Sequence, residues 1–265
     1  MSVRTYTGPT SASLGRPRAR YAAVPWLLTG LTVALQIAYP LTEGDARARL
    51  TQATVYAFFL ASASHALVWR GAAWAAGFVV ASVTTGFVVE AVGRSAGVPF
   101  GTYDYADSLG PELLGVPIVI PLAWAMMAYP ALIAARTLCV GRVTTPIVGA
   151  VALASWDVFL DPQMVAEGHW AFAFPEPSPP LIDDVPWTNF AGWMAVAVFL
   201  MLVLDRLPRR GAADGPPALL YLWTYASSVL ANLAFFDRPE VALAGGLVMG
   251  TVALPFAWRR WADRP

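Results

Sequence analysis

Three acidic residues hold unusual positions for ionisable side chains, because each lies within or at the end of a long apolar stretch. Glu90 lies in GFVVEAVG and Asp157 in ASWDVFLDP, and Asp161 follows Asp157 by four residues. In a helix this spacing puts both aspartates on one face, about one turn or roughly 5 Å apart in depth. An ionisable side chain in such surroundings is costly unless it is paired or hydrated, so these residues indicate a functional site.

Their chemistry would be acid–base catalysis. Carboxyl groups that converge in an apolar setting repel one another and are poorly solvated, so at least one is expected to keep its proton near neutral pH. We predict Asp157 as the general acid because it lies one helical turn further into the apolar segment than Asp161. Glu90 and Asp161 would orient or deprotonate a water molecule. Pro162 lacks an N–H group, so we expect the helix to end at Asp161, at the membrane interface. The alternative that Asp157 only forms a structural hydrogen bond to a neighbouring helix is left open.

The elements that position these residues are predicted to be membrane-spanning helices. The chain of 265 residues is 57% hydrophobic and 13% charged, with a mean hydropathy of +0.56, whereas soluble domains carry about 25% charged residues. Eight apolar runs have about the length that spans a bilayer: 24–40, 50–69, 72–92, 116–138, 144–160, 189–207, 218–236 and 241–258. We therefore expect an all-α, polytopic bundle of seven to eight transmembrane helices. It forms one domain (23–260) between a basic N-terminal tail (1–22) and a C-terminal tail (261–265).

The arginines predict the orientation of this bundle. With eight spans and both termini on one side, that side receives most of the arginines, and the opposite side keeps only Arg47, Arg49, Arg94 and Arg238. Short cytoplasmic loops are enriched in basic residues. We therefore expect an integral plasma-membrane protein with cytoplasmic termini, and with segments 94–115 and 162–188 as outer loops.

Aromatic residues are dense in and beside the two outer loops. Some would form an interfacial belt, but their number also suits a slot for a long, flat, apolar molecule, and ring faces stabilise a nearby cation. The aromatic residues are Phe100, Tyr103, Tyr105, Trp124, Trp156, Trp170, Phe172, Trp187 and Trp193. From these we predict a substrate-binding set of Tyr103, Tyr105, Trp124, Trp156, Trp170 and Trp193, together with Asn189. Asn189 at the start of the sixth span would hold water or cap its helix, and Asn232 could also reach the acidic cluster.

Several classes of function are excluded by composition. The chain has no lysine for a retinal Schiff base, one cysteine, and two histidines where oxygen-activating iron sites need clusters. It has no dinucleotide or P-loop motif and no basic stripe for nucleic acid. We expect no metal and no cofactor. His65 is interpreted as a packing residue, and His169 as an interfacial loop residue that could relay protons.

The motifs in the middle of the chain resemble the CruF-like family of membrane-bound carotenoid biosynthesis proteins, which includes carotenoid hydratases. They are Glu90 in a helix of small residues, FGTYDY at 100–105, LGP ending at Pro111, GVPIVIPLAW at 115–124, DVFLDPQM at 157–164, GHW at 168–170 and NFAGW at 189–193. The resemblance implies a membrane enzyme that adds water to the terminal double bond of an acyclic carotenoid and leaves a tertiary alcohol. Its partners would be the carotenoid, the lipid bilayer and other carotenoid biosynthetic enzymes.

Three alternatives remain. A cofactor-free carotenoid cyclase would form the same cation and close a ring. A membrane prenyltransferase would use Asp157, Asp161 and the Asp183–Asp184 pair to hold Mg²⁺ and a diphosphate, although the outer side has few arginines for that anion. A non-enzymatic carotenoid or lipid carrier would be expected to show broken helices near mid-membrane, whereas the polar groups here gather at one interface.

Overall fold

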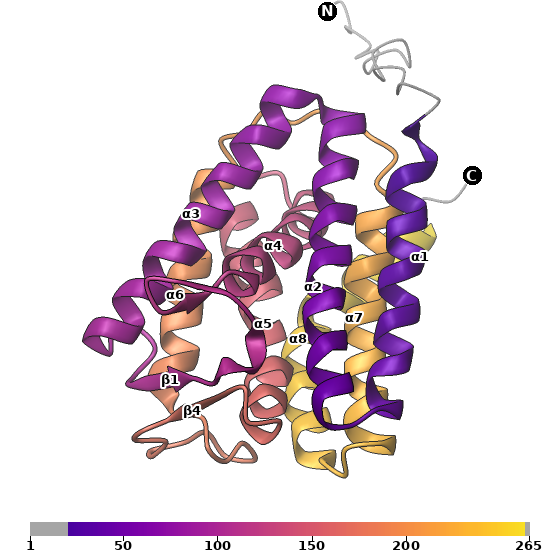
Figure 1. Ribbon diagram of the computed structural model, residues 1–265. Coiled ribbons are helices and arrows are strands. Elements are labelled where there is room, and N and C mark those ends of the chain that lie inside the picture. Colours follow the sequence, from indigo (N-terminus) through magenta and orange to yellow (C-terminus); the bar gives the residue numbers. More distant parts are fainter. Residues whose placement is uncertain (1–20, 263–265) are drawn as a thin grey trace, which may run out of the picture.

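The computed structural model describes residues 21–262, so most of both predicted tails lies outside the described residues. Eight long helices run alternately up and down and form one bundle (Figure 1). They are α1 (Ala23–Ala38), α2 (Gly44–His65), α3 (Ala72–Ala96), α4 (Val119–Leu138), α5 (Thr144–Ala166), α6 (Trp187–Leu204), α7 (Gly215–Ala234) and α8 (Pro239–Ala262). Short helical turns η3 (Tyr39–Leu41), η4 (Ala66–Arg70) and η5 (Asp107–Leu109) join some of these elements. Each predicted span overlaps one long helix, so the helical bundle is confirmed.

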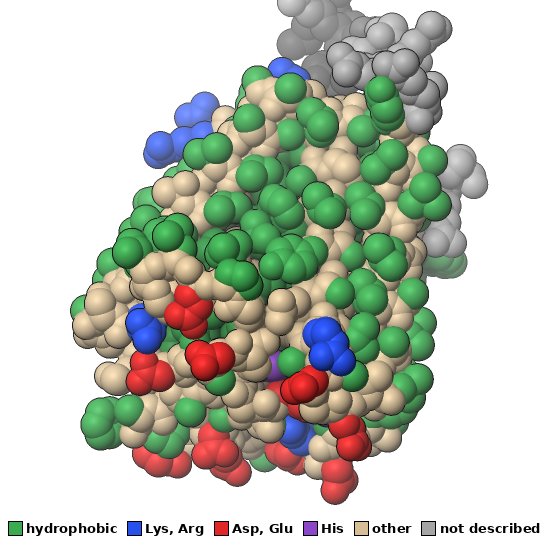
Figure 2. Space-filling view, in the orientation of Figure 1, with side chains coloured by type: hydrophobic (Ala, Val, Ile, Leu, Met, Phe, Trp, Pro, Cys, Tyr) green, Lys and Arg blue, Asp and Glu red, His purple; other side chains and the backbone are tan. Residues whose placement is uncertain are grey.

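Five of the described helices, α1, α3, α4, α6 and α8, are long and apolar enough to cross a membrane. Their sides carry large exposed apolar residues such as Leu27, Val80 and Leu247, each at least 65% exposed. Figure 2 shows this apolar surface along the helices, with acidic side chains gathered at the end that carries the long loops. Such a surface is stable against lipid and costly against water, so the chain is a membrane protein. That α2, α5 and α7 also span the bilayer remains a prediction.

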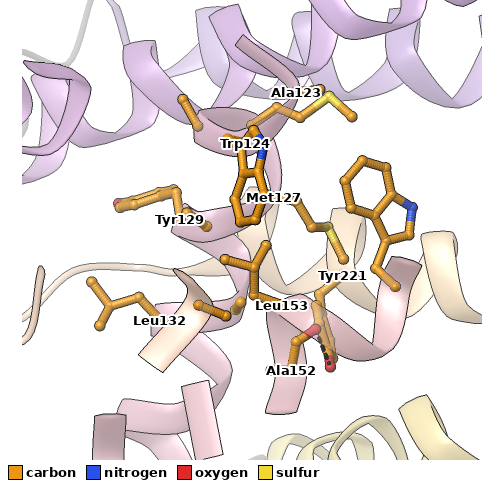
Figure 3. Close-up of a cluster of buried hydrophobic side chains, with 14 of the residues drawn as sticks. Ala123, Trp124, Met127, Tyr129, Leu132, Ala152, Leu153 and Tyr221 are labelled. Atoms are coloured by element: carbon orange, nitrogen blue, oxygen red, sulfur yellow. Dashed lines mark hydrogen bonds between the residues drawn. The ribbon is translucent and has the colours of Figure 1, made fainter. Parts of the chain in front are cut away.

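Helix α4 forms the centre of the bundle. It packs against α2, α3, α5, α7 and α8, and its residues are buried without a break from Ala123 to Ala135. Figure 3 shows side chains of α4 meeting those of α5 and α7, where the Tyr221 hydroxyl donates to the Ala152 carbonyl at 3.4 Å. Alternating alanine with large residues such as Trp124 and Leu132 lets neighbouring helices approach α4 closely.

The two predicted outer loops are joined by a small sheet that an all-α prediction did not include. Strand β1 (Tyr103–Tyr105) pairs antiparallel with β4 (Trp170–Phe172), so that Tyr103 faces Phe172 and Tyr105 faces Trp170. Strands β2 (Glu112–Leu113) and β3 (Val116–Pro117) form a hairpin whose turn has positive φ at Leu114 and Gly115. The β1–β4 pair ties the loop after α3 to the loop after α5.

The prediction that α5 ends at Asp161 was wrong. The helix continues through Pro162 to Ala166, and Gly168 in a left-handed conformation follows its end. Pro162 removes only one backbone donor, while the residues that follow, Gln163 and Met164, are buried and pack the extra turn. Asp161 therefore lies inside a helix instead of at an interfacial corner. The predicted loop 162–188 begins later for the same reason, and α3 likewise extends into the predicted loop 94–115.

Candidate active site

Asp157 and Asp161 of α5 meet at the side-chain amide of Asn189, which lies in the first turn of α6. Asp157 is 0% exposed and Asp161 is 3% exposed. Asn189 Nδ2 donates to Asp157 Oδ2 at 2.9 Å and also to Asp161 Oδ2. The two carboxyl groups therefore accept hydrogen bonds from the same amide, while Asp157 Oδ1 has no hydrogen-bond partner within the described residues. We call Asp157 and Asp161 the aspartate dyad.

Asn189 reaches the acidic cluster, which is one of its two predicted roles. The cap position of α6 is Pro186, and no side chain makes a capping hydrogen bond there. Both hydrogens of the Asn189 amide are instead available to the dyad, one for each carboxylate. This residue therefore fixes the relative position of the two aspartates from a different helix.

Glu90 lies on α3 and is held by three neutral donors. The Tyr103 and Tyr105 hydroxyls donate to its Oε2 at 2.5 and 2.7 Å, and Trp124 Nε1 donates to its Oε1 at 2.9 Å. Tyr103 and Tyr105 are alternate residues of β1 and so project from the same face of the strand. The FGTYDY motif thus supplies a pair of phenols to one carboxylate.

Two glycines next to Glu90 make this close approach possible. A Cβ at Gly86 would lie 3.0 Å from the Trp124 side chain, and one at Gly93 would lie 3.1 Å from the Tyr103 hydroxyl. These positions precede Glu90 by four residues and follow it by three, so all three lie on one face of α3. A side chain at either glycine would push a donor away from the carboxylate.

The two phenols remain protonated. Burial and the neighbouring Glu90 carboxylate raise the pKa of Tyr103 and Tyr105 above the ordinary tyrosine value. A phenol that keeps its proton is a permanent hydrogen-bond donor and does not itself serve as a base near neutral pH. The two hydroxyl groups can therefore hold the Glu90 side chain in place and stabilise negative charge on it.

Aromatic rings enclose the space between Glu90 and the dyad. Trp124 and Trp193 stack with centroids 3.9 Å apart and ring planes at 15°, and Tyr105 meets Trp170 edge-on at 5.8 Å. A cavity of about 40 Å³ lies among them, and we call it the acid cavity. Its lining comprises Glu90, Phe100, Tyr103, Tyr105, Ile120, Ala123, Trp124, Leu160, Asp161, Trp170, Phe172, Asn189 and Trp193.

Eight of the ten predicted site residues line this acid cavity, and two do not. Asp157 lies behind Asp161 and is joined to it through Asn189. Trp156 lines a different cavity and touches the site only through an edge-on contact with Trp193 at 6.1 Å. Of the other aromatic residues, Trp187 is 51% exposed and lies outside the cavity lining.

The predicted binding set omitted five lining residues. Phe172 and Phe100 belong to the aromatic group noted in the sequence, and the register of Phe172 with Tyr103 in the sheet places it here. Ile120, Ala123 and Leu160 carry no signal in the sequence that separates them from ordinary core residues.

The other polar residues considered in the sequence lie elsewhere. His65 is fully buried at the other end of α2, where Nδ1 contacts the Tyr129 hydroxyl at 2.7 Å, as a packing histidine would. His169 lies in the loop between α5 and β4, where it is buried and contacts Ser108 Oγ at 2.8 Å; its interfacial position stays a prediction. Burial lowers the pKa of His169, which favours the neutral ring. Asn232 donates to the Ser228 carbonyl and does not contact the carboxyl groups.

Within residues 21–262, none of the three carboxyl groups forms an ion pair with an arginine or histidine. The hydrogen-bond donors around Glu90 and the dyad are two phenols, one indole and one amide, all of them neutral. The site therefore combines buried carboxyl groups, neutral donors, and ring faces that would stabilise a carbocation.

Comparison with known proteins identifies the family of this chain. The family model described as "Carotenoid biosynthesis protein" matches residues 50–253, which include all three carboxyl groups. A bisanhydrobacterioruberin hydratase from Haloarcula japonica is 30% identical over 132 residues, which cover 48% of this chain and 43% of that relative. The match thus spans less than half the length of the curated relative, and no solved structure matches the chain. The family model covers well over half of the chain, and the protein therefore belongs to the carotenoid biosynthesis protein family.

Proposed function

We propose that this protein hydrates the terminal carbon–carbon double bond of an acyclic carotenoid and leaves a tertiary alcohol. The observation that carries the proposal is the acid cavity, which is lined by Asp161 of the dyad, by Glu90 and by the stacked pair of Trp124 and Trp193. Membership of the carotenoid biosynthesis family supports the class of substrate. The name of the Haloarcula relative supports hydration as the outcome.

The dyad supplies the proton in this scheme. Asp161 lines the cavity and passes its proton to the less substituted carbon of the double bond, which leaves a tertiary cation on the other carbon. Asp157 acts through Asp161 and Asn189 as a positioning residue that shares the proton. The proposed proton donor is therefore Asp161, which borders the cavity, in place of Asp157, which was predicted from its position in the helix alone.

Glu90 completes the reaction as the base. The tertiary cation is stabilised by the faces of Trp124 and Trp193 and by the negative charge of the carboxylates. The oxygen of a water molecule bonds to the cation, and one proton of that water passes to a carboxylate. Three hydrogen bonds from Tyr103, Tyr105 and Trp124 hold Glu90 for this step. Protons and electrons balance without a redox partner.

The cavity must widen to admit its substrate. A volume of about 40 Å³ holds a water molecule, whereas a cavity of about 150 Å³ is needed for a ring the size of benzene. Side chains from the β1–β4 sheet, such as Phe172, form one wall, so movement of this sheet would open the site. We propose that the sheet lifts when a carotenoid end group enters.

Expression in a lycopene-producing host tests the function. Mass spectrometry of the pigments should show the addition of one water per reacted end, and the Asp161→Asn variant should lack this product at equal membrane abundance. An Asp183→Asn variant makes the same change at an exposed aspartate that does not line the cavity, so it is the matched control and should keep the product. A ring-closed product of unchanged mass would instead identify a cyclase, and unchanged pigments would refute both reactions.

The prenyltransferase alternative has less support. Asp183 and Asp184, which would have to help hold a metal-bound diphosphate, are exposed and do not line the acid cavity.

A further inference from the structure

A second, larger cavity adjoins the acid cavity on the other side of α5. Its volume is about 170 Å³, and residues of α1, α2, α4, α5 and α7 line it. Leu160 lines both cavities, so at that point one side chain separates them. Trp156 lines the larger cavity and packs edge-on against Trp193 of the acid cavity. We call this larger space the polar cavity.

Eight of the seventeen residues that line the polar cavity carry uncharged hydrogen-bonding groups, and the other nine are apolar. The eight are Gln36, Tyr39, Thr51, Thr54, Gln163, Ser227, Ser228 and Asn232. Three buried atoms among them, Gln36 Oε1, Thr54 Oγ1 and Asn232 Oδ1, have no hydrogen-bond partner within the described chain. Asn232 is 3% exposed, and its amide nitrogen is already used in a bond to Ser228, so its free atom is the acceptor. Buried carbonyl oxygens of this kind require an O–H or N–H donor.

Charged residues contact the lining of the polar cavity from outside. Tyr39 and Phe236 meet edge-on at 6.1 Å, and the Arg47 guanidinium lies 5.6 and 5.7 Å from their ring centroids. Arg47 pairs with Glu167, and Arg238 donates to Gln163 Oε1 at 3.1 Å. These two arginines and one glutamate do not line the cavity themselves, but their charges favour water over hydrocarbon on this side of it.

We propose that the polar cavity holds the water that is the co-substrate of hydration and delivers it past Leu160 to the acid cavity. This inference rests on the proposed function, because only a hydration consumes water at the acid cavity. A space of this volume holds several water molecules with two or more polar partners each. The cation formed in the acid cavity takes up the oxygen of one such water, and a carboxylate receives its proton.

The first test measures whether water occupies the polar cavity, and it requires no activity. Met126 and Met127 are adjacent on α4 and both buried, but only Met126 lines the polar cavity. Hydroxyl radicals generated by X-rays from bound water oxidise side chains beside it. Footprinting of the full chain in lipid nanodiscs should oxidise Met126 about tenfold faster than Met127. Equal, slow oxidation of both residues would show a dry cavity and overturn the proposal.

The second test measures whether this water reaches the cation. The triple variant Gln36→Leu, Thr54→Val and Asn232→Leu removes three polar groups at nearly constant volume. It leaves the acid cavity intact. In D2O the dyad donates a deuteron, so a cation that receives no water returns to a hydrocarbon that contains deuterium. The ratio of alcohol to deuterated hydrocarbon should fall about tenfold in the variant, which corresponds to the loss of one or two hydrogen bonds.

Matched controls separate this effect from a general loss of structure. Thr32→Val makes the same change as Thr54→Val at a buried hydroxyl that bonds its own helix and does not line the cavity, so it should leave the ratio unchanged. An unchanged ratio in the triple variant would overturn the water route while leaving the hydratase proposal intact. Wild-type protein that yields neither alcohol nor deuterated hydrocarbon would refute the hydratase function itself, and with it the route.

Discussion

Carboxyl groups lie at both ends of the helix bundle, buried at one end and half-buried at the other, and the two ends satisfy them in opposite ways. At the end that carries the β1–β4 sheet, Glu90 and the aspartate dyad receive hydrogen bonds from two neutral phenols, one indole and one amide. At the opposite end, Asp214 pairs with Arg70 at 2.5 Å and Asp205 pairs with Arg136 at 2.9 Å. The three carboxyl groups of the candidate site have no ion-pair partner within the described residues, whereas Asp205 and Asp214 at the opposite end form ion pairs.

The ion pairs close the loop between α6 and α7. Arg70 donates to the Arg210 carbonyl and to the Tyr129 hydroxyl as well as to Asp214. Arg136 donates to the carbonyls of Leu204, Asp205 and Leu207. Each guanidinium thus donates to at least one backbone carbonyl of the loop. This network has a structural task and offers no free proton.

The difference teaches that charge balance, more than burial, marks the reactive end. A buried carboxylate beside a guanidinium is held in its ionised form. A carboxyl group surrounded by neutral donors exchanges its proton at less cost, which is what a general acid or base requires. Substitutions at the two ends should therefore affect different quantities: turnover at the β1–β4 end and stability at the opposite end.

The largest expected effect is on turnover at the dyad. Asp161→Asn should lower the rate of water addition by about 10²–10⁴-fold, the usual contribution of a general acid, with no loss of membrane abundance. Asp157→Asn should lower it less, because Asp157 does not border the cavity. Rates of alcohol formation in isolated membranes measure both. A greater loss for Asp157→Asn would identify Asp157 as the proton donor, as the sequence analysis predicted.

The next effect is on stability at the opposite end. Arg70→Met leaves the half-buried Asp214 without its charged hydrogen-bond donor and should lower the free energy of unfolding by about 1.5–3 kcal/mol, while the folded fraction keeps its turnover. Chemical unfolding in detergent micelles measures this loss. Arg94→Met is the control, because Arg94 lies 3.8 Å from an 83% exposed Asp104 side chain and should change stability by less than about 0.5 kcal/mol. Similar losses for both variants would contradict a structural role specific to the Arg70 pair.

A smaller effect is expected at the phenols. Tyr103→Phe removes one of three donors to Glu90 and should lower the rate of water addition about tenfold, as expected for a buried hydrogen bond to a charged group. In a Glu90→Gln background the same change should have little further effect, since the two residues act together. The measurement is the rate of alcohol formation by the wild type, the two single variants and the double variant. Additive losses would show that Tyr103 acts independently of Glu90.

The last prediction concerns which end of the bundle faces the cytoplasm, and its cysteine substitutions should affect activity and stability least. In a background with Cys139→Ser, a cysteine at Ser178 should react with a membrane-impermeant maleimide in intact cells. A cysteine at Ala213 should react only after permeabilisation, as the arginine distribution predicts. The reverse labelling pattern would place the acid cavity at the cytoplasmic face.

The sequence alone determined the bundle and its candidate acids. Apolar runs separated by arginine-containing loops predicted helices that the structure contains, because a bilayer demands long segments with internally satisfied backbones. The four-residue spacing of Asp157 and Asp161 predicted a shared face, because helix geometry is local. These inferences required no knowledge of which helices are neighbours.

Tertiary structure decided what the acids contact. The pairing of β1 with β4, which brings Tyr103 and Tyr105 to Glu90, joins segments more than 60 residues apart, and no local pattern specifies such a pair. The continuation of α5 through Pro162 depended on packing of Gln163 and Met164, whose burial outweighs one missing hydrogen bond. Only the cavity lining distinguishes Asp161 from Asp157 and places Asn232 in the polar cavity, because the side chains that border a cavity are fixed by how several helices pack together.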